Sequence, residues 1–146
     1  MSDALPPLPP KIEGAQHPPL FKTLLIVDDS PEVRHVVRAF LERDVAFKIC
    51  GEAGRGAEAI TKAEELKPDI ILLDLLMPQL NGIEAAALLK SRLPQTLVVL
   101  FSNYTEDIGR TLPSAVGVDL VVAKGSLTDL VESLKTLISR KAVSAG

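Results

Sequence analysis

The chain has 146 residues, 47% of them hydrophobic and 24% charged, which is the balance of one ordinary globular domain and excludes wholesale disorder. A formal net charge of -3 and an aromatic content of 3% argue against direct nucleic-acid binding. One cysteine excludes an internal disulfide, and no apolar run approaches the roughly 20 residues of a membrane span. The chain begins without the basic flank and apolar core of a secretory signal, so we expect a cytoplasmic protein without membrane contact.

The first residues form a separate segment. Six of the eleven prolines fall within the first 20 residues, and such a stretch cannot form a regular helix or central strand. We therefore predict an extended or disordered tail over 1–21. Its PPLPP run could dock in an aromatic groove, but a solvated tail is the favoured interpretation.

Order is predicted to begin with a buried strand over 23–27, where the sequence TLLIV is apolar and partly β-branched. Asp28, Asp29, Ser30 and Pro31 follow. Proline suits the first position of a helix, and Ser30 or Asp29 can cap it. The helical period then predicts one apolar face, with His35 on the opposite, solvated face, and that apolar face comprises Val33, Val36, Val37, Phe40 and Leu41.

The same alternation continues along the chain. Further strands are predicted over 47–50, 69–74, 96–101 and 119–123, and further helices over 57–66, 83–93, 106–116 and from 126 onward. Pro113 would kink or break the helix over 106–116. Five strands alternating with five helices predict an α/β domain over 22–141, with a parallel sheet covered on both faces. Residues 142–146 are expected to be a frayed end.

Polar side chains follow four of the predicted strands. Asp28 and Asp29 follow the first strand, Asp74 ends the third, Ser102 follows the fourth, and Lys124 follows the fifth. In an open parallel sheet, sites form outside the carboxyl ends of the strands, so these side chains should converge. A strand-end aspartate alone can simply cap a helix, and Asp29 alone fits that role.

The converging set suggests a specific chemistry. Three neighbouring carboxylates repel one another, and a divalent cation such as Mg²⁺, which prefers oxygen ligands, relieves that repulsion. One carboxylate can then attack phosphorus and form an aspartyl-phosphate. The ammonium group of Lys124 and the hydroxyl of Ser102 could stabilise the phosphoryl oxygens.

With these residues at these positions, the sequence resembles the receiver domains of two-component response regulators over residues 22–141. The resemblance is carried by LLIVDDSP, DIILLDLLMPQLNGIEAA, VVLFSN and GVDLVVAKGS. It implies a flavodoxin-like doubly wound sheet of five parallel strands in the order 2-1-3-4-5, with helices on both faces.

The resemblance also implies roles for individual residues. It makes Asp74 the phosphoacceptor, with Lys124 and Ser102 beside the phosphoryl group and Ser102 as the switch hydroxyl. It implies Mg²⁺ as cofactor, held by Asp28, Asp29, Asp74 and the backbone carbonyl of Leu76. Gly82 is expected to shape the loop beneath the site.

The sequence departs from the family pattern at several positions. Val121 stands where the family usually has Tyr or Phe, an aromatic residue that is thought to move with the switch hydroxyl. Gly125 follows the lysine in place of a frequent cis-proline, and Asn103 and Tyr104 follow the switch hydroxyl. These departures leave the acidic site intact. They put in question whether phosphorylation is signalled by the usual aromatic movement, because Val121 occupies that position.

The resemblance implies a single-domain response regulator without an output domain. Asp74 would accept a phosphoryl group from a histidine kinase or a histidine phosphotransfer protein and thereby change the binding of a downstream protein partner. We expect no enzyme activity beyond the chain's own phosphorylation and dephosphorylation. One alternative is a receiver-fold scaffold that binds its partner independently of phosphorylation. Another is an Asp-nucleophile phosphohydrolase, although those resemble D-x-D-x-T and this chain has D-D-S-P.

Overall fold

The computed structural model describes residues 21–75, 82–102 and 117–145. The tail over 1–20, the helix expected over 106–116, Leu76, Asn103 and Tyr104 lie outside the described residues. Within the part that is described, no helix is both long and apolar enough to cross a membrane.

The described chain alternates strands and helices, as the sequence predicts. The strands are β1 (Lys22–Val27), β2 (Phe47–Ala53), β3 (Ile70–Asp74), β4 (Leu97–Ser102) and β5 (Leu120–Ala123). The helices are α1 (Pro31–Leu41), α2 (Gly56–Leu66), α3 (Gly82–Arg92) and α5 (Leu127–Ala145). All strand pairs are parallel, and the sheet order β2-β1-β3-β4-β5 confirms the predicted flavodoxin-like topology.

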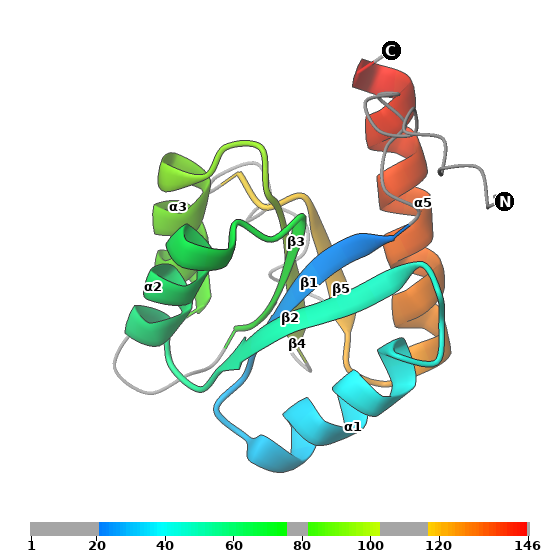
Figure 1. The fold of residues 1–146 in the computed structure, drawn as a ribbon, viewed down its shortest axis with the longest axis horizontal. Coiled ribbons are helices and arrows are strands. Elements are labelled where there is room, and N and C mark those ends of the chain that lie inside the picture. The colour runs from blue at the N-terminus through cyan, green and yellow to red at the C-terminus, as the bar shows by residue number, and fades with distance from the viewer. Residues whose placement is uncertain (1–20, 76–81, 103–116, 146) are drawn as a thin grey trace, which may run out of the picture.

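The helices cover both faces of the sheet (Figure 1), α2 and α3 on one side and α1 and α5 on the other. Successive side chains of a strand point to opposite faces, so β1 contributes to both layers. Leu25 packs with the α2/α3 layer, whereas Leu24 packs with the α1/α5 layer. Every residue of β3 is buried, as expected for a central parallel strand.

Helix α1 begins where its capping residues predict. The Ser30 side chain accepts a hydrogen bond from the Val33 amide at 3.2 Å, and Pro31 occupies the first helical turn. His35 is exposed, as expected. The prediction for Val36 is wrong, because this side chain is 53% exposed. The buried positions Val37 and Leu41 follow i, i+4 spacing, and this leaves Val36 at the solvent edge of the apolar face.

Two elements are longer than their sequence patterns indicate. Strand β2 continues to Ala53 because Glu52 and Ala53 still pair with the end of β1, although the apolar pattern weakens after Cys50. Helix α5 continues to Ala145, through most of the segment that was expected to fray. Its first residue is Leu127, one residue after the predicted start, and the Ser126 hydroxyl before it accepts a hydrogen bond from the Asp129 amide at 3.1 Å.

Candidate functional site

The three predicted carboxylates lie together at the carboxyl edge of the sheet. Asp28 directly follows β1, and Asp74 ends the neighbouring strand β3. One carboxylate oxygen from each of Asp28, Asp29 and Asp74 lies within 4.8 Å of the others. Asp28 and Asp74 are only 4% and 7% exposed, whereas Asp29 is exposed to solvent. The cluster is therefore a half-buried group of oxygen donors with one open side.

Lys124 supplies the positive charge of this cluster. Its Nζ lies 2.8 Å from Asp28 Oδ2 and 3.3 Å from Asp74 Oδ1. Burial by itself would lower the pKa of Lys124, but the hydrogen bond to Asp28 and the charges of Asp28 and Asp74 outweigh it, so the pKa is raised. Lys124 is therefore a fixed ammonium ion between two buried carboxylates.

Ser102 reaches the same edge through the register of the sheet. Asp74 pairs with Phe101, which places Ser102 one residue beyond the end of β3. Ser102 in turn pairs with Ala123, and the Lys124 amide donates to the Ser102 carbonyl at 3.1 Å. Ser102 is 2% exposed. The carboxylates and the ammonium thus converge as predicted, and the backbone of Ser102 lies at the same edge of the sheet.

Asp28 is held by several bonds besides the ion pair with Lys124. Its amide donates to the Ala53 carbonyl at 3.0 Å, and its Oδ1 accepts from the Ser30 amide at 2.9 Å. The Ser30 contact also links the carboxylate to the capped start of α1, since Ser30 is the N-cap of that helix. The Asp28 carboxylate consequently has a defined orientation that does not depend on a bound ligand.

Gly82 packs against the backbone of the candidate phosphoacceptor. A Cβ atom at this position would lie 2.3 Å from the Asp74 carbonyl oxygen and 2.6 Å from Leu75 Cα. The Gly82 amide also donates to the Leu75 carbonyl at 2.6 Å. The expected role of Gly82 in shaping the site thus has a steric cause, because only a residue without a side chain permits this approach.

Val121 occupies the second position of β5, opposite Leu100 of β4. Its side chain is partly buried and packs against the core layer that α2 and α3 cover. All peptide bonds in the described part of the chain are trans, including the bond between Lys124 and Gly125.

Arg34 contacts the site although the sequence pattern gives no sign of it. Its place on the polar face of α1 indicates a solvated side chain, yet its Nη1 donates to the Asp28 carbonyl at 2.6 Å. A guanidinium on the first turn of a helix can reach back to the loop before it, but nothing in the helical period indicates that it does.

The donor chemistry of the cluster fits Mg²⁺. This ion takes oxygen ligands, binds through few protein carboxylates, and keeps other positions for water and phosphate. Asp28, Asp29 and Asp74 could hold it, and exposed Asp29 leaves room for water. The Leu76 carbonyl, expected as a further ligand, lies outside the described residues.

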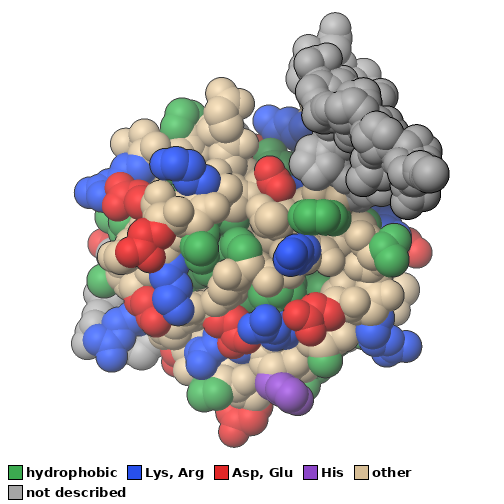
Figure 2. All heavy atoms as spheres, in the orientation of Figure 1, with side chains coloured by type: hydrophobic (Ala, Val, Ile, Leu, Met, Phe, Trp, Pro, Cys, Tyr) green, Lys and Arg blue, Asp and Glu red, His purple; other side chains and the backbone are tan. Residues whose placement is uncertain are grey.

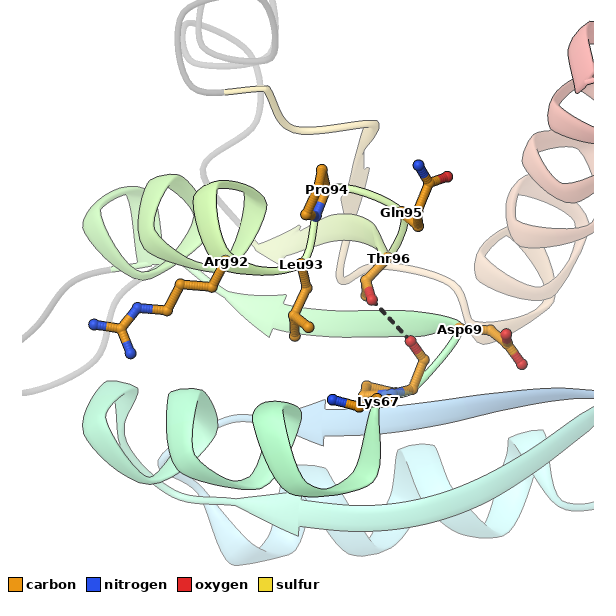
Figure 3. Close-up of a pocket in the computed structure, with 8 residues that line it drawn as sticks. Lys67, Asp69, Arg92, Leu93, Pro94, Gln95 and Thr96 are labelled. Atoms are coloured by element: carbon orange, nitrogen blue, oxygen red, sulfur yellow. Dashed lines mark hydrogen bonds between the residues drawn. The ribbon is translucent and has the colours of Figure 1, made fainter.

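A concavity lies at the opposite, amino-terminal edge of the sheet (Figure 3). This hollow of about 290 Å³ lies beside the C-terminal ends of α2 and α3 and is lined in part by Lys67, Arg92 and Thr96. The Thr96 hydroxyl donates to the Pro68 carbonyl at 3.0 Å. None of the residues that line this hollow belongs to the acidic cluster, so the hollow is separate from the candidate phosphorylation site.

Comparison with known proteins gives one consistent result. The family model of the response regulator receiver domain matches residues 24–135. The response regulator protein VraR of Staphylococcus epidermidis is 40% identical over 115 residues, which are 77% of this chain and 54% of that protein. VraR of Staphylococcus saprophyticus is 38% identical over 123 residues, 82% of this chain and 58% of that protein. The chain therefore spans about half the length of the curated relatives it matches.

Solved structures of receiver domains resemble the fold of this chain. The response regulator domain of Thermotoga maritima CheB superposes with a TM-score of 0.74 at 30% identity, covering 82% of this chain and 97% of that one. The signal receiver domain of NarL from Mycobacterium tuberculosis gives a TM-score of 0.74 at 30% identity, with coverages of 81% and 96%.

Proposed function

The chain belongs to the response regulator receiver domains, and from this membership we propose that Asp74 accepts a phosphoryl group from a histidine kinase or a histidine phosphotransfer protein. The observation that carries the proposal is the setting of Asp74. It is buried at the end of a central strand, beside two further carboxylates and 3.3 Å from the Lys124 ammonium. No comparable group of acidic residues occurs elsewhere in the described part of the chain.

The proposed chemistry uses each member of the site. A carboxylate oxygen of Asp74 forms a bond to phosphorus while the bond from phosphorus to the donor nitrogen breaks, and the donor histidine recovers its electron pair. Bound Mg²⁺ would offset the negative charge that the carboxylates and the phosphoryl group bring together. Lys124 provides a positive charge to the phosphoryl oxygens, and the Ser102 hydroxyl provides a hydrogen bond.

The consequence of phosphorylation would be a change in partner binding. A phosphoryl group adds about -1.5 to -2 charges at the carboxyl edge of the sheet. Ser102 and Lys124 lie at the ends of β4 and β5, so a shift of either residue is passed directly to those strands. A downstream protein that prefers one arrangement would then be gained or released. Under this proposal the chain acts on no substrate other than its own aspartyl-phosphate, and it binds no nucleic acid directly.

A second function is favoured by one observation, the partly buried Val121. A valine has little surface to relocate and no polar tip, so the aromatic movement that the family resemblance implies has no counterpart at this position. In this alternative the chain is a scaffold whose partner binds equally well with and without phosphorylation. Equal partner affinity for the phosphorylated protein and for Asp74→Asn would support the scaffold and count against the switch.

The first experiment is phosphoryl uptake from acetyl phosphate, followed by intact mass. Wild type should gain one phosphoryl group only when MgCl₂ is present, and Asp74→Asn should gain none. Asp129→Asn is the matched control, because it removes an exposed carboxylate in the first turn of α5 and should leave uptake unchanged. Uptake by Asp74→Asn would contradict the proposed acceptor. No uptake by folded wild type would mean either strict dependence on a kinase or a silent site, and would favour the scaffold.

A further inference from the structure

The acidic cluster is connected to helix α1 and strand β2 through one arginine. Arg34 donates from Nη1 to the Asp28 carbonyl at 2.6 Å, and from Nε to Glu52 Oε1 at 3.0 Å. Its side chain is only 20% exposed. A single guanidinium therefore links three elements, the end of β1, the end of β2 and the first turns of α1.

Glu52 is held in place from a second side. Arg38, one turn further along α1, donates from Nη1 to Glu52 Oε2 at 2.7 Å. Lys62 of α2 contacts the Glu52 backbone carbonyl. Acidic and basic side chains interleave on this face of the molecule, where β2 lies beside α1 (Figure 2). Glu52 thus gives Arg34 a fixed anchor.

The space around Arg34 is also restricted. A Cβ atom at Gly54 would lie 3.3 Å from Arg34 Nη1, which is tighter than most contacts of real side chains. The Gly54 amide donates to Glu58 at 2.8 Å, which keeps this loop beside the guanidinium. Arg34 is thereby directed at the Asp28 carbonyl and away from solvent.

We propose that Arg34 is a positioning residue for the metal site: by fixing the Asp28 carbonyl it sets the orientation in which the Asp28 and Asp29 carboxylates meet a divalent cation. This inference rests on the proposed function, because it assumes Mg²⁺ at the acidic cluster. The Asp28 carbonyl belongs to the peptide bond between Asp28 and Asp29, the two residues that carry these carboxylates. A rotation of this peptide would move the two donors relative to Asp74.

The sign of the effect separates positioning from electrostatics. Arg34→Ala removes a positive charge from the neighbourhood of the site, and on Coulombic grounds alone this favours a bound cation. A loss of Mg²⁺ affinity must therefore come from geometry. Arg38→Ala is the matched control, because it removes the same charge from the same helix and the same partner Glu52 but has no bond to Asp28.

The test is calorimetric titration of metal-free protein with MgCl₂. We expect Arg34→Ala to raise the Mg²⁺ dissociation constant by about tenfold, the size typical of residues that orient metal ligands. Arg38→Ala should leave the constant unchanged or slightly lower it. In the acetyl phosphate reaction, the rate of Arg34→Ala at saturating MgCl₂ should return to the wild-type rate, since the reacting groups are intact. A purely structural defect would not be rescued by Mg²⁺ in this way.

Circular dichroism shows whether each variant is folded. If Arg34→Ala does not fold, Arg34→Lys and Glu52→Gln carry the test. Lysine lacks the rigid fork by which Arg34 bonds the Asp28 carbonyl and Glu52 from two separate nitrogens, and glutamine weakens the anchor, so both variants should bind Mg²⁺ less tightly than wild type. Equal or tighter binding by the Arg34 variants would overturn the inference. Such binding by the Arg34 variants would still leave the proposed function in place, provided that wild type takes up a phosphoryl group normally. Failure of wild type itself to bind Mg²⁺ would overturn both.

Discussion

Lys124 and Asp28 are 96 residues apart in the chain, yet Nζ of the first donates to Oδ2 of the second at 2.8 Å. This bond joins the residues that directly follow β1 and β5, two strands that are separated by β3 and β4 in the sheet. The ammonium also lies beside Asp74, so it neutralises part of the charge of the acidic cluster. The stability of the free protein and its affinity for a cation are therefore linked through Lys124.

Replacing Lys124 with methionine should expose that link. Lys124→Met leaves two buried carboxylates without their counter-charge, and we expect a loss of about 1–3 kcal/mol in the free energy of unfolding without metal. Added MgCl₂ should stabilise the variant more than wild type, because the cation then meets uncompensated carboxylates. Urea unfolding with and without MgCl₂ measures both effects.

Lys135→Met is the control for this comparison. Lys135 pairs with Asp44 at 2.6 Å, but its side chain is half exposed, and exposed ion pairs contribute about 0–1 kcal/mol. A Lys124→Met protein no less stable than Lys135→Met would contradict the prediction.

The ion pair between Glu52 and the two arginines should give a pH-dependent contribution to stability. The hydrogen bond from Arg38 lowers the pKa of Glu52 below its usual value of 4.5, and the bond from Arg34 adds to this effect. A lowered pKa in the folded state means stability that is present above pH 4.5 and lost as the pH falls through the folded-state pKa. Urea unfolding of wild type and Glu52→Gln at a series of acid pH values measures this contribution. Wild type should have the larger free energy of unfolding above pH 4.5, and the difference between the two proteins should shrink as the pH falls below that value. A difference that is constant with pH would rule out this linkage.

Gly82→Ala should disturb the site through the backbone. The new Cβ would lie 2.3 Å from the Asp74 carbonyl oxygen, so α3 or the end of β3 must move. We expect a loss of about 1–3 kcal/mol in unfolding free energy, as for other overpacked sites, together with slower phosphoryl uptake. Gly125→Ala serves as the control, since nothing lies within 4 Å of a Cβ at Gly125. Equal stability of the two variants would show that the contact at Gly82 relaxes without cost.

Ser102→Ala should separate phosphorylation from the response to it. The variant keeps Asp74 and Lys124, so it should still accept a phosphoryl group. Without the hydroxyl, the amide NMR shifts that phosphorylation causes in β5 should become smaller. Ser102→Thr retains the hydroxyl and should restore them. Full-sized shifts in Ser102→Ala would exclude Ser102 as the switch hydroxyl.

The amino-acid sequence determines the fold and most of the candidate site by local rules. Apolar runs separated by amphipathic segments predict the five parallel strands, and the caps at Ser30 and Ser126 predict where two helices begin. The carboxyl ends of parallel strands share one edge of the sheet. Aspartates placed directly after apolar runs therefore had to meet, as Asp28 and Asp74 do.

The tertiary structure alone decided the contacts that depend on which elements become neighbours. Helical period gives Val36 an apolar position and Arg34 a polar one, but in the folded chain the valine is exposed and the arginine donates to the Asp28 carbonyl. Pairing with β1 likewise extends β2 to Ala53 past the end of its apolar run. Periodicity and capping act over a few residues of chain. These contacts depend on distances between segments far apart in sequence, which no local pattern contains.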